Sequence, residues 1–297
     1  MITTLTQCSP AELPELVSLV DDEFVHGRGR QASLGRRYPG LLSENNLDNL
    51  YLARSGSEPC GTVAVKRFRW LAGGGEWQGA MVGLVCTASN YRNQGVASQL
   101  LASITARLHE TETDFAVLWT TIPEFYERLG WRLRDHGLFG EYGQKSGNRT
   151  RPETVDERLE VDRFAWLEEV RGRWLSQRVR REPIDYQSLP LPAQNVRCFT
   201  APDAGEGYAL VGDVDTTGYV YELVGDPEAF GAIWSKLQRH YQTIYINDRR
   251  GSPSERWLQW ETSIKWQPQL HAMWLRMSRP MADVCIDDWH ISYFDRI

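Results

Sequence analysis

The first third of the chain alternates between helix-like and strand-like patterns of apolar residues. Within "PAELPELVSLVDDEF", the spacing of Leu13, Leu16, Val17 and Val20 predicts a first helix, and Pro14 suits its first turn. The runs "NLYLARSG", "CGTVAVKRFRW" and "GAMVGLVCT" follow, joined by turns rich in Ser and Gly. They predict three antiparallel strands.

A second helix and two further strands are predicted next. From Ala97 the apolar stripe has helical spacing, with Leu100, Leu101, Ile104 and Leu108 on one face, and "FAVLWTT" then has the continuous apolar character of a buried strand. In "TTIPEFYERLG", Thr121 and Glu124 are spaced as a capping box for a short helix that Gly130 ends. The segment "WRLRDHGLFGEYG" returns to β character.

The second half of the chain repeats part of this order. "GYALVGD" and "GYVYELVG" predict two strands, "DPEAFGAIWSKLQRH" a helix with a stripe of Phe230, Ile233, Trp234 and Leu237, and "TIYIN" a buried strand. The polar stretch 146–160 separates the two halves. We therefore expect domains at 1–147 and 148–297.

Composition narrows the classes of protein to which the chain can belong. A net charge of −6 and a pI near 5.6 argue against a nucleic-acid binder, which usually carries a basic footprint. No apolar run approaches the roughly 20 residues that cross a bilayer, and the start of the chain lacks a signal-peptide pattern. We therefore expect a soluble, cytoplasmic protein without membrane contact, and its oligomeric state stays open.

The cysteines and histidines suggest neither disulfides nor a metal site. Five cysteines are widely spaced without a C-x-x-C pair, and six histidines lack any metal-ligand spacing. No metal is expected, and the cysteines are expected to be reduced thiols. No motif for a covalent intermediate is present, so any group transfer is expected to be direct.

The segment "YRNQGVASQL", between a predicted strand and a predicted helix, carries the candidate chemistry. A helix N-terminus presents unpaired N–H groups and a partial positive charge, which attract phosphate. Gly95 lets the backbone approach a ligand, Ala97 keeps the next contact small, and Arg92 adds charge. By itself R-x-x-G-x-A also fits an ordinary tight turn, and neither "GRGR" nor "GGG" continues into a P-loop.

Together, "VCTASNYRNQGVASQLL" and the later "FYERLGW" resemble the GNAT superfamily of N-acetyltransferases. The resemblance implies an α/β (α+β) fold with a mixed, mostly antiparallel central sheet flanked by helices. It also implies that acetyl-CoA is the co-substrate and that the turn binds its pyrophosphate. The residues carried over for the pyrophosphate are Arg92, Asn93, Gln94, Gly95, Val96 and Ala97, and those for the acetyl and pantetheine end are Val85, Cys86 and Thr87. Tyr126 matches the tyrosine that protonates the departing CoA sulfur.

Over most of its length the chain is similar to the enhanced-intracellular-survival group, which pairs an active GNAT domain with a degenerate one. The stretches that carry this resemblance are "YPGLLSENNLDNLYLA" and "YVYELVGDPEAFGAIWSKL". It implies tandem GNAT folds. Members of that group usually continue into a sterol-carrier-like domain, which we expect this chain, ending at Ile297, to lack.

Acetyl transfer to an amine needs a proton acceptor, because alkylamines are mostly protonated at neutral pH. Asp21, Asp22 and Glu23 are expected to follow the first helix, where a GNAT substrate loop lies, and Glu124 is near Tyr126. Each also has a plain structural explanation, as a solvated charge or a cap, and a water chain is a further alternative.

Proton donation by Tyr126 is uphill unless its pKa is depressed or the transfer is concerted, because a phenol is a weaker acid than a thiol. Phe125 fits a core position better than Tyr126 does, since adjacent helix residues point in different directions.

Two functions from different classes remain open. The first is an acetyl-CoA-dependent N-acetyltransferase acting on a small amine, with the acidic net charge favouring a polycation. The alternative is a non-catalytic acyl-CoA-binding or interaction module, which would need the turn but not Tyr126. In the second half, Asp226, Pro227 and Glu228 stand where the turn would be, so no cofactor site is expected there.

Overall fold

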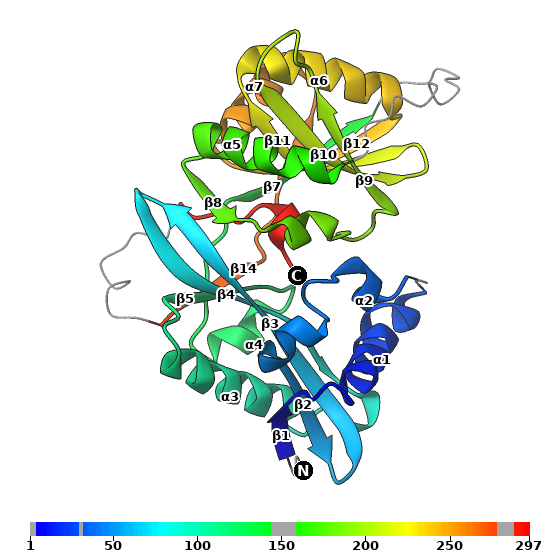
Figure 1. The fold of residues 1–297 in the computed structure, drawn as a ribbon, viewed down its shortest axis with the longest axis vertical. Helices are drawn as coiled ribbons and strands as arrows, with labels where there is room; N and C mark the ends of the chain where they lie inside the picture. Colours follow the sequence, from blue (N-terminus) through cyan, green and yellow to red (C-terminus); the bar gives the residue numbers. More distant parts are fainter. Residues whose placement is uncertain (1–3, 30–31, 144–158, 278–287) are drawn as a thin grey trace.

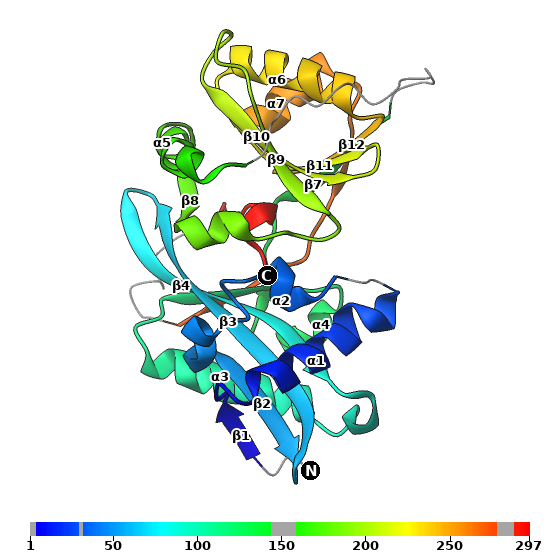
Figure 2. The ribbon, with the colours of Figure 1, turned by 45° about the vertical axis from the view of Figure 1, so that its right-hand side comes forward.

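Two β-sheets, each flanked by helices, make up the molecule in the computed structural model, which describes residues 4–29, 32–143, 159–277 and 288–297 (Figure 1). The N-terminal end lies at the far end of the lower sheet. The last residues of the chain lie between the two sheets in both ribbon views (Figure 2). The expected mixed α/β fold with mostly antiparallel sheets is confirmed.

The first sheet has eight strands, and its central hairpin is longer than expected. It runs in the order β1-β2-β3-β4-β5-β14-β6, with β8 also on β3. The strands are β1 (Thr4–Gln7), β2 (Leu50–Ser55), β3 (Glu58–Ala72), β4 (Gly75–Thr87), β5 (Phe115–Trp119), β6 (Arg132–Leu133), β8 (Gln177–Arg180) and β14 (Ala272–Arg276). The three expected antiparallel strands are β2, β3 and β4. The strand β5 adds parallel to β4.

Helices cover both faces of the first sheet. They are α1 (Leu13–Phe24), α2 (Leu34–Arg37), α3 (Val96–Glu110) and α4 (Pro123–Glu127). The predicted stripe of α3 is buried against the sheet. Short 3-10 turns lie at His26–Arg28, Glu44–Asn49, Ser89–Tyr91, Val161–Arg163, Pro183–Gln187 and Tyr293–Asp295.

The second sheet has six strands in the order β13-β7-β12-β11-β10-β9. They are β7 (Gly137–Gly143), β9 (Asn195–Thr200), β10 (Gly207–Val214), β11 (Thr217–Gly225), β12 (Thr243–Arg249) and β13 (Lys265–Pro268). The helices of this half are α5 (Phe164–Trp174), α6 (Pro227–His240) and α7 (Pro253–Glu261). The order β10, β11, α6, β12 is the predicted strand–strand–helix–strand repeat.

The two sheets exchange strands. The strand β7 precedes residue 147 in sequence but pairs with β12 in the second sheet, and β14 follows it but pairs with β5 in the first. The predicted boundary at 147/148 itself lies outside the described residues. The division into 1–147 and 148–297 therefore remains a prediction, and the sheets do not follow it strand for strand.

Aromatic residues fill the space where the halves meet. The ring of Trp289 lies 5.1 Å from that of Phe115 and 5.7 Å from that of Trp70, centroid to centroid. Arg37 of α2 donates to the carbonyl oxygens of Leu189 and Ala193 across the same boundary. Part of the tryptophan content thus joins the two halves, and the C-terminal segment is held against β5.

The predicted capping box of α4 is wrong. The N-cap of this helix is Ile122, which has no capping side chain, and Thr120 accepts a hydrogen bond from the Ile122 N–H instead. The Pro at position 123 sets the first turn without needing a donor, so the helix starts one residue later than the box requires.

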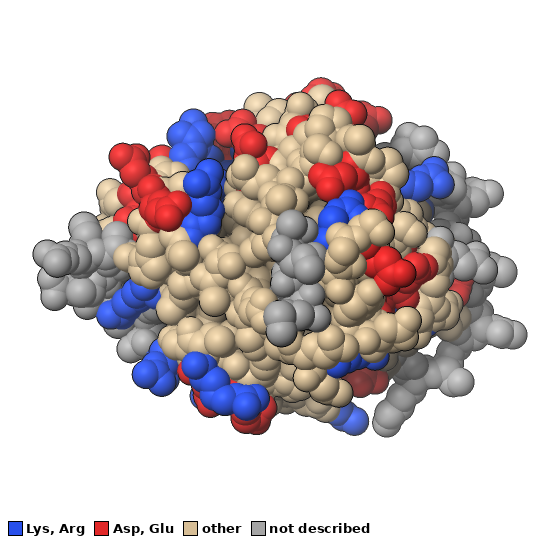
Figure 3. Space-filling model, turned by 90° about the horizontal axis from the view of Figure 1, so that it is seen from below, with Lys and Arg blue, Asp and Glu red and all other residues tan. Residues whose placement is uncertain are grey.

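No helix in the described part of the chain is long and apolar enough to span a membrane. Four of the cysteines are described, and all four are buried free thiols. On the face seen from below in Figure 3, acidic and basic side chains are interspersed around a broad uncharged area.

Candidate active site

A cavity opens in the first half where two parallel strands separate. The strands β4 and β5 pair only from Gly79 to Met81 and from Phe115 to Val117, and beyond that they diverge. The cavity has a volume of about 560 Å³. Its lining includes Val82 to Val85 of β4 and Leu118 to Ile122, which end β5 and lead into α4. We call it the β4–β5 cavity.

A β-bulge shapes the β4 side of this cavity. Leu84 has a φ of 50°, and the pairing of β4 with β3 shifts register at this point. A bulge leaves backbone groups unpaired and re-aims the side chains of its strand. Gly83 lies beside it, and a Cβ there would come within 2.9 Å of Ile297 Cγ1. The C-terminal segment therefore packs directly on the point where the strand bends.

The three predicted residues of the acetyl and pantetheine end are placed differently from one another. Val85 lines the β4–β5 cavity, whereas Cys86 and Thr87 are not part of its lining. The Cys86 side chain is buried in the cluster under α1, and burial raises the pKa of its thiol to about 12. The Cys86 side chain is therefore an inert packing group.

The predicted pyrophosphate turn has the geometry that phosphate binding needs. Gly95 is the N-cap of α3 with a φ of 80°, and a Cβ there would meet only the Gln99 side chain, at 3.7 Å. The backbone N–H groups of Val96, Ala97 and Ser98 begin the helix and have no partner within it. Such donors at the start of a 15-residue helix form a site for an anion.

Arg92 is less free than the sequence suggests. Its guanidinium forms an ion pair with Glu23 at 2.5 Å and lies 3.4 Å from the carbonyl oxygen of Thr87. The ion pair bridges α1 and the turn. Arg92 thus fixes the turn in place, and its charge is shared with Glu23 before any phosphate arrives.

The predicted location of the acidic triplet is wrong. Asp21, Asp22 and Glu23 lie within the last turn of α1, because the helix continues to Phe24. Asp21 is buried and accepts a hydrogen bond from the Leu34 N–H, while Asp22 is exposed and contacts His26. None of the three lines the β4–β5 cavity. Their use in substrate binding remains a prediction without geometric support.

Tyr126 lines the β4–β5 cavity from α4. Its ring packs against those of Phe125 and Trp131, with centroids 4.9 and 6.5 Å apart. No hydrogen bond to its hydroxyl occurs within the described residues. The hydroxyl is therefore available to a molecule in the cavity.

Tyr126 and Phe125 reverse the predicted burial. Tyr126 is 9% exposed, while Phe125 is only partly buried. Burial raises the pKa of Tyr126, so a depressed tyrosine pKa does not ease proton donation. The sequence left two routes for proton donation by Tyr126, a depressed pKa or a concerted transfer, and only the concerted transfer remains. Glu124 is exposed on the first turn of α4 and does not line the cavity.

Residues distant in sequence complete the cavity, and none of them was predicted. They are Gln269, His271, Tyr293, Arg296 and Ile297, together with Phe24, Arg28, Leu34 and Tyr38 in and after the first helices. The only feature of the sequence that could have indicated them was the apolar run of β14, which fits a further strand next to the cavity. Among the described lining residues there is neither an Asp nor a Glu.

Asp135 holds His271 at the cavity. Its Oδ2 accepts hydrogen bonds from the N–H groups of His271 and Ala272, both at 2.9 Å. Burial alone would raise the pKa of Asp135, but the hydrogen bond with His290 and the charge of Arg296 hold it well below its usual range. Asp135 is thus a permanent anion that anchors the start of β14.

Arg296 closes the opposite wall. Its guanidinium lies over the rings of Trp119 and Tyr293, at 5.0 and 5.3 Å, and donates to the carbonyl oxygen of Ile291. Burial lowers the pKa of Arg296, yet a guanidinium stays charged at any neutral pH. The cavity therefore combines aromatic walls with a fixed positive charge.

At the corresponding junction of the second half, the predicted cap of the helix is observed. Asp226 is the N-cap of α6, where it accepts from the Ala229 N–H at 2.7 Å and from the Glu206 N–H at 2.8 Å. Pro227 occupies the first helical position. The anionic cap fills the place that a phosphate would need. Within the described residues, no cluster of His, Cys, Asp or Glu is arranged for a metal ion.

Comparison with known proteins assigns the class. Residues 6–134 match the family described as an acetyltransferase (GNAT) domain. The first half of the chain therefore carries a GNAT domain, and the protein is an enzyme of the N-acetyltransferase class. No curated protein matches the chain by sequence.

Solved structures share the fold across nearly the whole chain. A GCN5-related N-acetyltransferase from Kribbella flavida is 16% identical with a TM-score of 0.70, and covers 94% of this chain and 72% of its own. One from Anabaena variabilis is 14% identical with a TM-score of 0.72, covering 93% and 73%. Eis1 from Mycobacterium abscessus is 16% identical with a TM-score of 0.64, covering 93% and 74%. At these identities the likeness concerns the fold.

Proposed function

We propose that the protein transfers the acetyl group of acetyl-CoA directly to a primary amine held in the β4–β5 cavity. The observation that carries the proposal is that Tyr126 and Val85 line the same cavity, and that the Tyr126 hydroxyl has no described partner. Val85 lies on β4, which separates from β5 at this cavity and leads to the turn at 93–97. We call this separation of two parallel strands a fork. A binding module would need the turn alone. The tyrosine hydroxyl, without a described partner, supports transfer chemistry.

The residues of the chain have separate tasks in this mechanism. The backbone N–H groups of residues 93–97 bind the pyrophosphate, and the bulge at Leu84 leaves room for the acyl end in the fork. Acetyl-CoA supplies an acyl carbon activated as a thioester. The amine nitrogen bonds to that carbon as the carbon–sulfur bond breaks, and Tyr126 gives its proton to the sulfur in the same step.

His271 is our candidate for the proton acceptor. It is the only described lining residue with an imidazole, the side chain that takes up and releases protons nearest neutral pH. It accepts a proton from the ammonium form of the substrate before attack. After attack, the nitrogen releases a second proton, which returns to the Tyr126 phenolate and restores its hydroxyl.

The lining favours an acceptor with an aromatic or aliphatic body over a polycation. Phe24, Tyr38, Trp119 and Tyr293 supply aromatic surface, and Arg296 supplies positive charge. A polycation would meet this charge with neither an Asp nor a Glu among the described lining residues to attract it. We therefore propose an arylalkylamine-like acceptor in place of the polycation that the net charge suggested.

Release of free CoA thiol tests the proposal. Phenethylamine should be acetylated with a kcat/KM at least about tenfold above that of spermidine, and mass spectrometry should show one added acetyl group per product. Equal or better use of spermidine would overturn the acceptor class. Absence of any turnover with a broad amine panel, despite acetyl-CoA binding, would favour the binding module.

The finer relationships remain proposals. We propose that the chain belongs with the tandem enhanced-intracellular-survival group, supported by the coverage of Eis1 and by the repeated strand–helix–strand unit. The second half would then pack against the first and help to form the amine site, which the lining residues Pro190 and Leu191 support. A cytoplasmic location remains a prediction from the sequence.

A further inference from the structure

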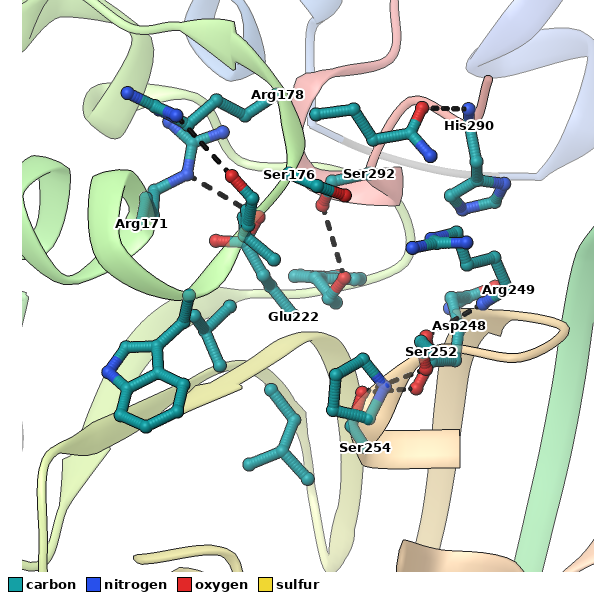
Figure 4. Close-up of a pocket in the computed structure, with 18 of the residues that line it drawn as sticks. Arg171, Ser176, Arg178, Glu222, Asp248, Arg249, Ser252, Ser254, His290 and Ser292 are labelled. Carbon is teal, nitrogen blue, oxygen red and sulfur yellow. Dashed lines mark hydrogen bonds and ion pairs between the residues drawn. The ribbon is translucent and has the colours of Figure 1, made fainter. Parts of the chain in front are cut away.

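The second sheet contains a fork of its own, with a cavity in it. The parallel pairing of β11 with β12 ends at Val220 and Ile246, just as that of β4 with β5 ends at Met81 and Val117. Beyond this point the strands diverge around a cavity of about 260 Å³ (Figure 4). Residues 221–225 of β11 and 247–249 of β12 line it. We call it the β11–β12 cavity.

This cavity does not suit a coenzyme. The start of α6 is capped by Asp226, whose carboxylate already accepts two backbone N–H bonds, so no anion site remains there. Cavities for drug-sized ligands usually enclose about 300 to 1,000 Å³. The β11–β12 cavity is smaller than this range and fits a molecule with few heavy atoms.

Buried polar atoms in its wall lack hydrogen-bond partners. Asn247 is 9% exposed, and its Oδ1 accepts no hydrogen bond within the described residues. The side chain of Arg171 is fully buried, and its Nε and Nη2 make no hydrogen bond, although Glu222 and Asp295 lie at 3.7 and 3.5 Å. An unsatisfied buried polar group costs about 1 to 3 kcal/mol. The wall therefore offers both an acceptor and donors to a ligand.

Two carboxylates of this cavity are paired with arginines. Arg181 binds Glu222 at 3.0 Å and Asp295 at 2.6 Å, and Arg171 adds a second positive charge to the same pair. Asp248 accepts from the Ser254 hydroxyl at 2.6 Å, and burial raises its pKa. The charges of Glu222 and Asp295 are therefore balanced within the protein.

Positive charge remains at the cavity. The guanidinium of Arg249 has neither an ion pair nor a hydrogen bond within the described part of the chain, and it lies beside His290 in Figure 4. Burial lowers the pKa of His290 to about 4, so the imidazole adds no charge at neutral pH. Arg178 also lines the cavity, and its Nε lacks a partner. The balance therefore favours an anion.

We propose that the β11–β12 cavity binds a small organic carboxylate that also carries a hydrogen-bond donor, such as a hydroxy acid. The carboxylate lies against the guanidinium of Arg249, which has no described acceptor. The hydroxyl donates to Asn247 Oδ1. Both halves of the molecule then use the fork between parallel strands as a ligand site, one for acyl transfer and one for a small acid.

Titration of the full-length protein with L-lactate tests this site, followed by calorimetry and by the melting temperature. Propionate, which lacks the hydroxyl, inorganic phosphate and potassium chloride at matched ionic strength are the other arms. Lactate should bind saturably with one site per chain and propionate at least about fivefold more weakly. Absence of saturable lactate binding, or tighter binding of phosphate than of lactate, would overturn the proposal.

Two variants and a control locate the site. Arg249→Gln should weaken lactate binding at least tenfold, and Asn247→Leu should remove the preference for lactate over propionate. Arg250→Gln changes the adjacent, exposed arginine and should bind as the unaltered protein does. Unchanged lactate affinity in a folded Arg249→Gln protein would contradict the assignment. The assay needs no acetyl transfer, so its outcome is independent of the proposed function.

Discussion

Replacing Tyr126 with Phe separates chemistry from folding in this protein. The ring keeps its contacts with Phe125 and Trp131, and the hydroxyl that is lost has no partner within the described residues. No hydrogen bond is broken and no partner is left unsatisfied. We therefore expect the free energy of unfolding to change by less than about 0.5 kcal/mol.

The loss in rate should be much larger. General acid catalysis contributes about 100- to 10,000-fold, which corresponds to about 3 to 5 kcal/mol of the activation free energy. The KM for acetyl-CoA should stay nearly constant, because the pyrophosphate contacts lie at residues 93–97. Since burial raises the pKa of Tyr126, the tyrosine stays protonated, and kcat of the unaltered enzyme should not fall with rising pH below about pH 10.

Single-turnover measurement of thiol release isolates the chemical step. Tyr245→Phe provides the matched control, because this tyrosine lies on β12 in the second sheet, stacked on Phe139 and away from the β4–β5 cavity. A single-turnover rate for Tyr126→Phe within about threefold of the control would refute the role of the hydroxyl, whatever the steady-state values.

Three further predictions concern the stability of the second half. Asp226→Ala removes the cap of α6 and should lower the free energy of unfolding in urea by about 1 kcal/mol; no change would mean that water replaces the cap. Arg181→Met leaves two buried carboxylates without their closest partner and should cost about 3 to 5 kcal/mol, and a loss below 1 kcal/mol would argue against a buried network. His290 has a pKa of about 4 when folded and 6.5 as its ordinary value, so only the unfolded chain gains a proton between these values. Stability should therefore rise from pH 4 to 6.5, by on the order of 3 kcal/mol, and His290→Gln should flatten that rise if the assignment holds.

The local elements were predictable from the sequence because their causes are local. The stripe from Leu100 to Leu108 is buried at the expected spacing, and Gly95 has the positive φ that a strand-to-helix turn of this kind needs. Asp226 caps α6 with Pro227 at the next position, as their residue types indicate. In each case a few neighbouring residues decide the conformation.

The composition of the cavity was not predictable in this way. Ala272 pairs with Trp119 and Arg276 with Phe115, strands more than 150 residues apart in sequence, and this pairing brings His271 to the site. An apolar run such as "AMWLR" fits any open sheet edge, so its own pattern does not select β5 as its partner. The ion pair of Glu23 with Arg92 likewise depends on the packing of α1 beside the turn.

Calorimetric titration with acetyl-CoA tests the central claim most directly, because the molecule has two forks and only one has an open turn. We predict one site per chain and no binding in Gly95→Glu, which places a carboxylate where the pyrophosphate would lie. Gly74→Glu is the matched control, since Gly74 is also exposed, with a φ of 77° and open space around it. It should bind normally. Two equivalent sites per chain, or unchanged binding in a folded Gly95→Glu protein, would contradict the account.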